Sequence, residues 1–152
     1  MGMITDYFVA TDERAEALAG CGPAGEELPK LALKWVEPAV LGSRLWAIIE
    51  EAPVAEGQSP PADRSRFRAA DRLVALAEDQ TSGVERIADG FVRALSALPD
   101  ERIPAVAARW ATAEEWVGPW APGDLDSTVL ALRDLARQVR LPDQHLYVWW
   151  CV

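Results

Sequence analysis

Apolar residues crowd both ends of the chain, in short runs whose alternation is typical of β-strands. The first run, residues 3–10, is MITDYFVA. Alternation places Tyr7 and Val9 on one face of such a strand and Ile4 and Phe8 on the other. Because both faces are mainly apolar, we predict a strand that is covered on both sides.

The chain closes with HLYVWWCV, which is almost free of charge. As a strand this run would also be apolar on both faces: Tyr147, Trp149 and Cys151 on one, Leu146, Val148, Trp150 and Val152 on the other. A strand that met solvent would normally keep one polar face, and an exposed apolar terminus would favour aggregation. We therefore predict a central, covered strand rather than a binding platform, paired with the first run.

Helical spacing begins directly after the first strand. Thr11 or Asp12 would cap a short helix that ends by Ala19, where glycines follow. Pro38 would open a second helix that ends near Ala52.

Segment 27–37, between these two helices, is apolar but ambiguous. Four more helices are predicted from apolar stripes: Phe67, Ala70, Val74, Ala77; then Val84, Ile87, Phe91, Leu95, Leu98; then Ile103, Val106, Ala107, Trp110, Ala113; and finally Leu125, Val129, Leu132, Ala136, Val139. Ser82 and Glu85 have capping-box spacing at the start of the second stripe, and Pro104 opens the third.

These elements predict an α+β fold, mostly helical, with a small sheet that contains both the N-terminal and the C-terminal strand. Residues 1–152 are expected to form one domain, since either half alone would have a thin core. Pro53–Asp63 is rich in Pro and small polar residues and is expected to be a flexible loop.

Charge narrows the choice of partners. The formal net charge is -9, and residues 1–62 carry ten acids against four bases. A negative surface repels phosphate backbones and anionic lipids, so a basic protein is the expected partner, with no nucleic acid and no membrane. Without a leader pattern or a long apolar stretch, a cytoplasmic location is expected.

Candidate chemistry is sparse. Cys21 and Cys151 lack the spacing of a metal or redox pair, so no metal and no cofactor is predicted. His145 is the single histidine and is expected to be a polar residue at the edge of the last strand. Asp6 lies inside an apolar strand, so its carboxylate needs a partner or an altered pKa.

The candidate binding residues are Glu50, Glu51, Trp116 and Trp120. The two acids end a predicted helix, where a solvated face is the ordinary alternative. The two tryptophans flank a Gly-Pro turn, where indoles often anchor protein contacts, although both could instead cap the core.

Together these features favour a small acidic interaction factor, of the immunity-protein or antitoxin kind, that blocks a basic partner protein. The alternative is a small-ligand-binding domain or hydrolytic enzyme whose acids converge only in the folded chain. A deep cleft that contains Asp6 or His145 would favour this alternative.

The opening MGMITDYF, the helix ATDERAEAL and the late helix LRDLARQV before a short apolar strand resemble the YfbM-like family of small bacterial domains of unknown function. The resemblance covers about the first 20 and the last 20 residues, and the middle is shorter than in that family. It implies an α+β fold with both terminal strands in one sheet, and it transfers no functional residue.

Overall fold

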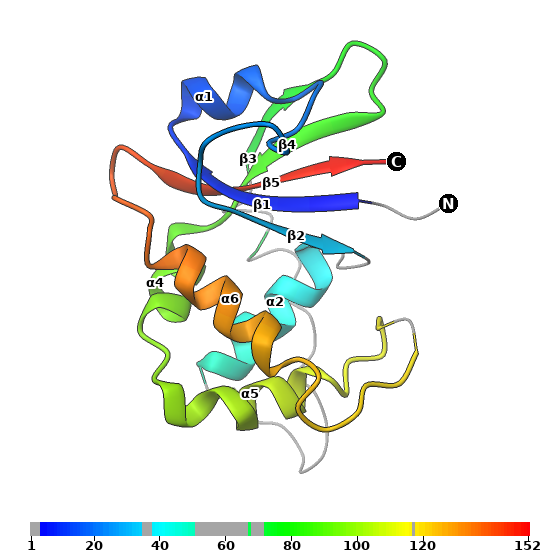
Figure 1. The fold of residues 1–152 in the computed structure, drawn as a ribbon, viewed down its shortest axis with the longest axis vertical. Helices are drawn as coiled ribbons and strands as arrows, with labels where there is room; N and C mark the ends of the chain where they lie inside the picture. Colours follow the sequence, from blue (N-terminus) through cyan, green and yellow to red (C-terminus); the bar gives the residue numbers. More distant parts are fainter. Residues whose placement is uncertain (1–3, 35–37, 51–66, 68–71, 117) are drawn as a thin grey trace.

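A five-stranded antiparallel sheet organises the chain, in the computed structural model that describes residues 4–34, 38–50, 67, 72–116 and 118–152. Its strands are β1 (Ile4–Ala10), β2 (Lys30–Lys34), β3 (Arg72–Leu76), β4 (Ser82–Arg86) and β5 (His145–Cys151), in the order β2-β1-β5-β4-β3. The described helices are α1 (Asp12–Ala17), α2 (Pro38–Ile49), α4 (Asp89–Ser96), α5 (Ile103–Trp110) and α6 (Asp126–Ala136), with a 3-10 turn at Asp100–Arg102. In Figure 1, α1 lies on one face of the sheet and the other helices lie on the opposite face.

The predicted central strand is confirmed. β5 pairs antiparallel with β1 along its whole length, from Ile4 opposite Cys151 to Ala10 opposite His145. On its other side β5 pairs with β4, also antiparallel. The α+β fold with both terminal strands in one sheet is therefore established, and the start of β1 lies beside the end of β5 (Figure 1).

Both faces of the central strands are buried, as their alternation predicted. A helix-side core takes Tyr7 and Val9 from β1 together with Leu146 and Val148 from β5. An α1-side core takes the intervening residues, among them Phe8 and Tyr147, and packs them under Ala15 and Leu18. Alternation along one strand therefore supplies two separate apolar layers.

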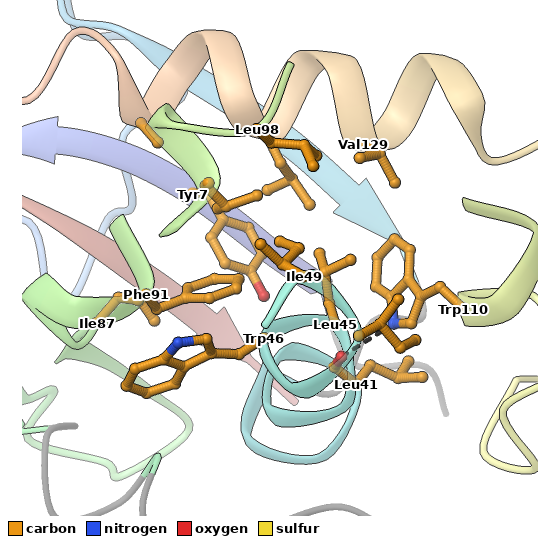
Figure 2. Close-up of a cluster of buried hydrophobic side chains, with 14 of the residues drawn as sticks. Tyr7, Leu41, Leu45, Trp46, Ile49, Ile87, Phe91, Leu98, Trp110 and Val129 are labelled. Carbon is orange, nitrogen blue, oxygen red and sulfur yellow. Dashed lines mark hydrogen bonds between the residues drawn. The ribbon is translucent and has the colours of Figure 1, made fainter. Parts of the chain in front are cut away.

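Aromatic side chains fill much of the helix-side core (Figure 2). The rings of Trp46, Phe67 and Phe91 lie 5.5 to 6.4 Å apart, mostly edge to face. The indole nitrogen of buried Trp110 donates a 2.9 Å hydrogen bond to the Leu41 carbonyl oxygen, which joins α5 to α2 (Figure 2). The bond satisfies a polar group that burial would otherwise leave unpaired.

Several predicted helix boundaries are confirmed. The Thr11 hydroxyl accepts a hydrogen bond from the Arg14 amide and caps α1, although this helix ends at Ala17. α2 begins at Pro38, and α5 carries a proline in its first turn. The last stripe forms α6, and the ambiguous segment contributes β2.

The predicted helix from Val84 to Leu98 is wrong in its first third. Ser82–Arg86 is strand β4, and the helix begins only at Asp89. Ser82 forms no capping box, because its hydroxyl donates to the Ala19 carbonyl oxygen at 2.7 Å. Pairing with β5 overrides the local periodicity, so Val84 lies in the α1-side core whereas Phe91 lies in the helix-side core.

The predicted helix from Phe67 to Ala77 is wrong from Arg72 onward, although Phe67 itself is helical. Arg72–Leu76 is strand β3, which forms an antiparallel hairpin with β4. The Asp79 carboxylate accepts hydrogen bonds from the amide and the hydroxyl of Thr81, and Gln80 has a positive φ of 57°. An aspartate that bonds the residue two positions later is typical of a turn, so Asp79 is the local feature of the sequence that indicates a hairpin here. The loop predicted at Pro53–Asp63 lies outside the described residues.

A matched pair of leucines tests how far the fold depends on β5. Leu146 is fully buried in β5, whereas Leu130 on α6 is 39% exposed. We expect Leu146→Ala to lower the free energy of unfolding by about 2 to 5 kcal/mol, because it leaves a cavity between the strand and the helices. Leu130→Ala should change that free energy by less than about 0.5 kcal/mol. Urea unfolding measures both, and equal losses would contradict a central role for β5.

Candidate functional site

The two candidate tryptophans lie in one aromatic ladder but differ in exposure. Trp110, Trp116 and Trp120 contact edge to face, with ring centroids 4.8 and 5.3 Å apart. Trp116 is only 9% exposed, and its indole nitrogen donates a 2.8 Å hydrogen bond to the Trp110 carbonyl oxygen. Trp120 is 39% exposed. Trp116 is therefore part of the core, and Trp120 is the tryptophan that reaches solvent.

Trp120 borders a small groove, which we call the tryptophan groove. One wall belongs to the segment before α6 and the other to the end of α5: Trp120, Ala121, Pro122, Gly123, Leu125 and Asp126 face Ala107, Ala108, Ala111 and Thr112. The hollow has a volume of about 180 Å³. The side of the hollow that comes from α5 and the residues after it carries only alanines and a threonine, so the larger Trp120 indole extends beyond them.

The loop that carries Trp120 is held in place at both ends. The Arg44 guanidinium and the Glu115 carboxylate form a partly buried ion pair at 2.7 Å, which fixes the loop to α2. The Asp124 carboxylate accepts a 2.8 Å hydrogen bond from the Ala121 amide. Gly118 and Gly123 have φ values of 91° and 89°, which other residues rarely adopt. The groove is thus preformed by bonds within the chain.

Negative potential surrounds the tryptophan groove. Asp126 is the charged residue among those that line it in the described structure. Asp124 is exposed beside it, and Ala111 and Thr112 lie at the carbonyl end of α5, where the helix dipole is negative. The site therefore suits a cationic group better than an anion.

The candidate acids do not join this groove. Glu50 is exposed after the end of α2, and its carboxylate accepts a 2.9 Å hydrogen bond from the Trp46 indole nitrogen. Arg102, just before α5, donates to the Ile49 carbonyl oxygen at 3.0 Å. Glu50 thus lies near the start of α5, whereas the tryptophan groove lies at the end of this eight-residue helix, which is about 12 Å long. Glu51 lies outside the described residues.

His145 belongs to a group of polar residues that the sequence did not reveal. Its Nδ1 lies 3.0 Å from one Asp89 carboxylate oxygen, and Arg86 contacts the other oxygen at 3.1 Å. The Tyr147 hydroxyl donates to the Asp12 carboxylate. Burial and the nearby Asp12 carboxylate raise the pKa of Tyr147, so the phenol stays protonated and remains the donor. We call these five residues the polar clamp.

The polar clamp joins the starts of α1 and α4 to neighbouring strands. Arg86 on β4 stands directly opposite Tyr147 on β5. The carboxylates of Asp12 and Asp89 each have partners within the clamp, so its main hydrogen bonds are already made in the folded chain. Neither His145 nor Asp6 lines the tryptophan groove. The same holds for three further hollows, which lie between α4 and α6, beside Asp12 and beside Arg102. The clamp therefore has the character of a structural network.

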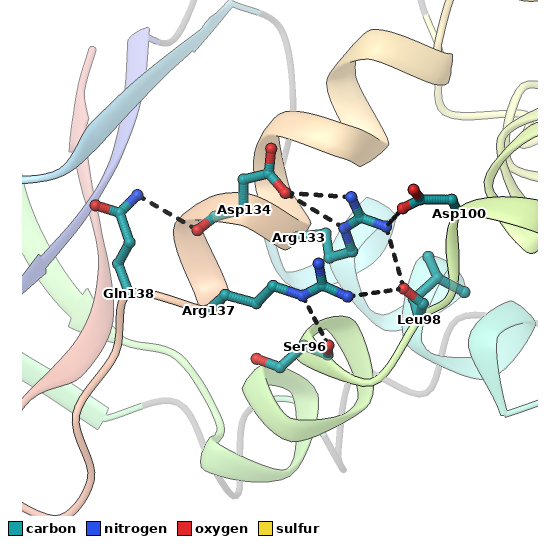
Figure 3. Close-up of polar contacts among 7 residues, drawn as sticks. All are labelled: Ser96, Leu98, Asp100, Arg133, Asp134, Arg137 and Gln138. Atoms are coloured by element: carbon teal, nitrogen blue, oxygen red, sulfur yellow. Dashed lines mark hydrogen bonds and ion pairs between the residues drawn. The ribbon is translucent and has the colours of Figure 1, made fainter.

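The largest of these hollows, about 480 Å³, lies between α4 and α6 and is lined partly by Arg93 and Arg137. Figure 3 shows that Arg137 donates to the carbonyl oxygens of Ser96 and Leu98. Arg133 bonds the same Leu98 oxygen as well as neighbouring carboxylates (Figure 3). These guanidiniums satisfy carbonyls at and beyond the end of α4, which is a structural task.

Two smaller hollows, lined in part by Asp12 and by Arg102, have volumes of about 140 and 290 Å³. In the described part of the chain, no three His, Cys, Asp or Glu residues are grouped closely enough to hold a metal ion. The described helices are also too short, or too polar, to cross a bilayer.

Comparison of the chain with protein-family models, with curated proteins and with solved structures gives no significant match. The resemblance to the YfbM-like family therefore stays a prediction. Any proposal for this chain has to be argued from its own geometry.

Asp6 offers a test of how the sheet tolerates a carboxylate. It lies on β1 between Trp149 on β5 and Ala32 on β2. Burial raises its pKa above the ordinary 3.8, and the charge of Lys30 opposes this shift. Since the ionised form is disfavoured in the folded state, Asp6 costs stability as pH rises through its folded pKa. Asp6→Asn should therefore raise the melting temperature slightly at pH 7.

This gain should shrink toward zero as pH falls below 3.8, where wild-type Asp6 is protonated in both states. Thermal unfolding of both proteins from pH 3 to pH 8 gives the difference in their melting temperatures. The titration of all other acids affects both proteins alike and therefore cancels in this difference. A lower melting temperature for Asp6→Asn at pH 7 would show that the Lys30 interaction outweighs burial.

A double-mutant cycle tests the polar clamp. Tyr147→Phe should lower the free energy of unfolding by about 1 to 2 kcal/mol, because a buried hydrogen bond to a carboxylate is lost. In an Asp12→Ala background the same change should cost much less. Chemical unfolding of the four proteins gives the coupling energy, and a value near zero would mean that this bond contributes nothing to stability.

Proposed function

We propose that the protein is a small acidic interaction factor, of the immunity-protein or antitoxin kind, that binds a basic partner protein in the cytoplasm. The observation that carries this proposal is Trp120, a large apolar side chain held in solvent by a fixed loop, beside an acidic residue. Tryptophan is the residue type most enriched among the anchors of protein interfaces.

Contacts that anchor the described part of the loop support binding by a preformed surface. Trp116 packs under Trp120, and the Arg44–Glu115 ion pair fixes the segment before it. A preformed site loses less conformational entropy on association than a loop that must order itself. In this proposal Trp120 is the contact residue, whereas Trp116 supports it from below.

Charge supports a basic partner. The net charge of -9 gives the protein a negative potential that attracts cationic proteins over a Debye length of about 8 Å in physiological salt. Exposed acids away from the centre of an interface act mainly on the rate of encounter. Glu50 and Glu51 are proposed to have this steering role, because Glu50 is distant from the tryptophan groove.

The size of the tryptophan groove favours a protein partner over a free small molecule. Its volume of about 180 Å³ is below the range of roughly 300 to 1,000 Å³ that is usual for small-molecule sites. A single side chain of a partner is the better match. The alternative of a ligand-binding or hydrolytic site has one supporting observation, the His145–Asp89 pair, whose histidine is buried.

Binding kinetics test this proposal, with a basic partner recovered from the native host at low salt. Trp120→Ala should speed dissociation by about thirtyfold, the equivalent of about 2 kcal/mol. Leu76→Ala is the matched control, because Leu76 is 45% exposed and lies on the edge strand β3, outside the groove lining. Glu50→Lys should mainly slow association and reduce its dependence on salt.

Thermal unfolding of each variant separates binding from folding. Trp120→Ala and Glu50→Lys should keep the wild-type melting temperature, whereas Trp116→Ala should lower it, because Trp116 is buried against Trp110. Unchanged dissociation of Trp120→Ala, with the fold intact, would contradict the proposed function.

A further inference from the structure

We propose that the tryptophan groove recognises one arginine side chain of the partner, held between the Trp120 indole and the Asp126 carboxylate. This inference rests on the proposed function and specifies its central contact. It starts from groups at the groove that have no partner among the described residues.

Two polar groups at the groove are unused in the described structure. The Asp126 carboxylate makes no hydrogen bond or ion pair there, although Asp126 lies in the first turn of α6 and is half-buried. The indole N–H of Trp120 likewise has no acceptor among the described residues. The indole nitrogens of Trp46, Trp110, Trp116 and Trp149 donate hydrogen bonds, whereas that of Trp150 is buried and, like that of Trp120, has no acceptor among the described residues. The groove therefore offers one acceptor and one donor to a partner.

The charges at the groove favour a cationic occupant over an anionic one. The amino end of α6 would attract an anion, but Asp126 already supplies a negative charge in its first turn. The opposite wall is the carbonyl end of α5, which adds negative potential. A cation at the groove would meet Asp126, the α5 carbonyl end and the aromatic ring together.

Arginine fits this combination better than lysine. Its planar guanidinium stacks on an indole and can bind a carboxylate through two parallel hydrogen bonds. Its aliphatic stem can lie along apolar surface, which Ala108 and Ala111 provide. A lysine ammonium is more strongly hydrated and cannot make the bidentate contact.

Short capped peptides test the inference without the natural partner. The probe is acetyl-Gly-Ala-Arg-Ala-Gly-amide, and its control replaces arginine by citrulline, which has nearly the same shape without the charge. The Trp120 indole N–H resonance, assigned by its loss in Trp120→Phe, reports binding by NMR. We expect saturable binding of the arginine peptide in the millimolar range, and binding of the citrulline peptide about tenfold weaker.

Variants of the protein locate the charge that matters. Asp126→Asn should weaken binding of the arginine peptide by about tenfold and leave its weak citrulline binding unchanged. Asp143→Asn is the matched control, because Asp143 is exposed and distant in sequence from the groove lining. A lysine peptide should bind more weakly than the arginine peptide.

Each contrary result has a distinct meaning. Equal binding of the arginine and citrulline peptides, or no saturable binding of either, would overturn the arginine inference. So would an Asp126→Asn protein that binds the arginine peptide as well as wild type. The proposed function fails separately, when Trp120→Ala dissociates from the protein partner at the wild-type rate.

Discussion

Burial of β5 on both faces is the constraint on which the rest of the structure depends. A strand with apolar side chains in both directions is stable only inside a sheet that is covered twice. β1 and β4 flank β5, α1 covers Tyr147, and the larger group of helices covers Leu146 and Val148. The single helix on one side needs additional support, and the polar clamp supplies it by joining Asp12 at the start of α1 to β5.

The parts of the fold that the sequence predicted are those whose pattern is strictly local. β1 and β5 are short runs of β-forming residues that are apolar on both faces, and α5 and α6 have stripes that belong entirely to one core. β3 and β4 could not be predicted in the same way, because Val84 and Ile87 fit a helical stripe although they lie in different cores. Pairing with β5, which is distant in the sequence, decides the conformation of β4, and β3 follows through its hairpin with β4.

The candidate site was predictable in composition but not in geometry. A tryptophan on each side of a Gly-Pro turn marked the loop, yet nothing local indicates that Trp116 folds back onto Trp110 while Trp120 stays exposed. The acids Glu50 and Glu51 matched the overall charge, but the distance of Glu50 from the groove depends on how α2 and α5 pack. The polar clamp could not be predicted from local sequence patterns, because 135 positions separate Asp12 from Tyr147.

The arrangement of indoles connects the core to the proposed function. Trp110 bonds the α2 backbone, Trp116 bonds the Trp110 backbone, and Trp120 packs against the ring of Trp116. Each step is more exposed than the one before it, so the ladder extends from the core to solvent. The core thereby supports the ring of Trp120, the most exposed of the three. A contact residue mounted in this way can be truncated without loss of a core hydrogen bond, which is why binding and stability should respond to different positions of the same ladder.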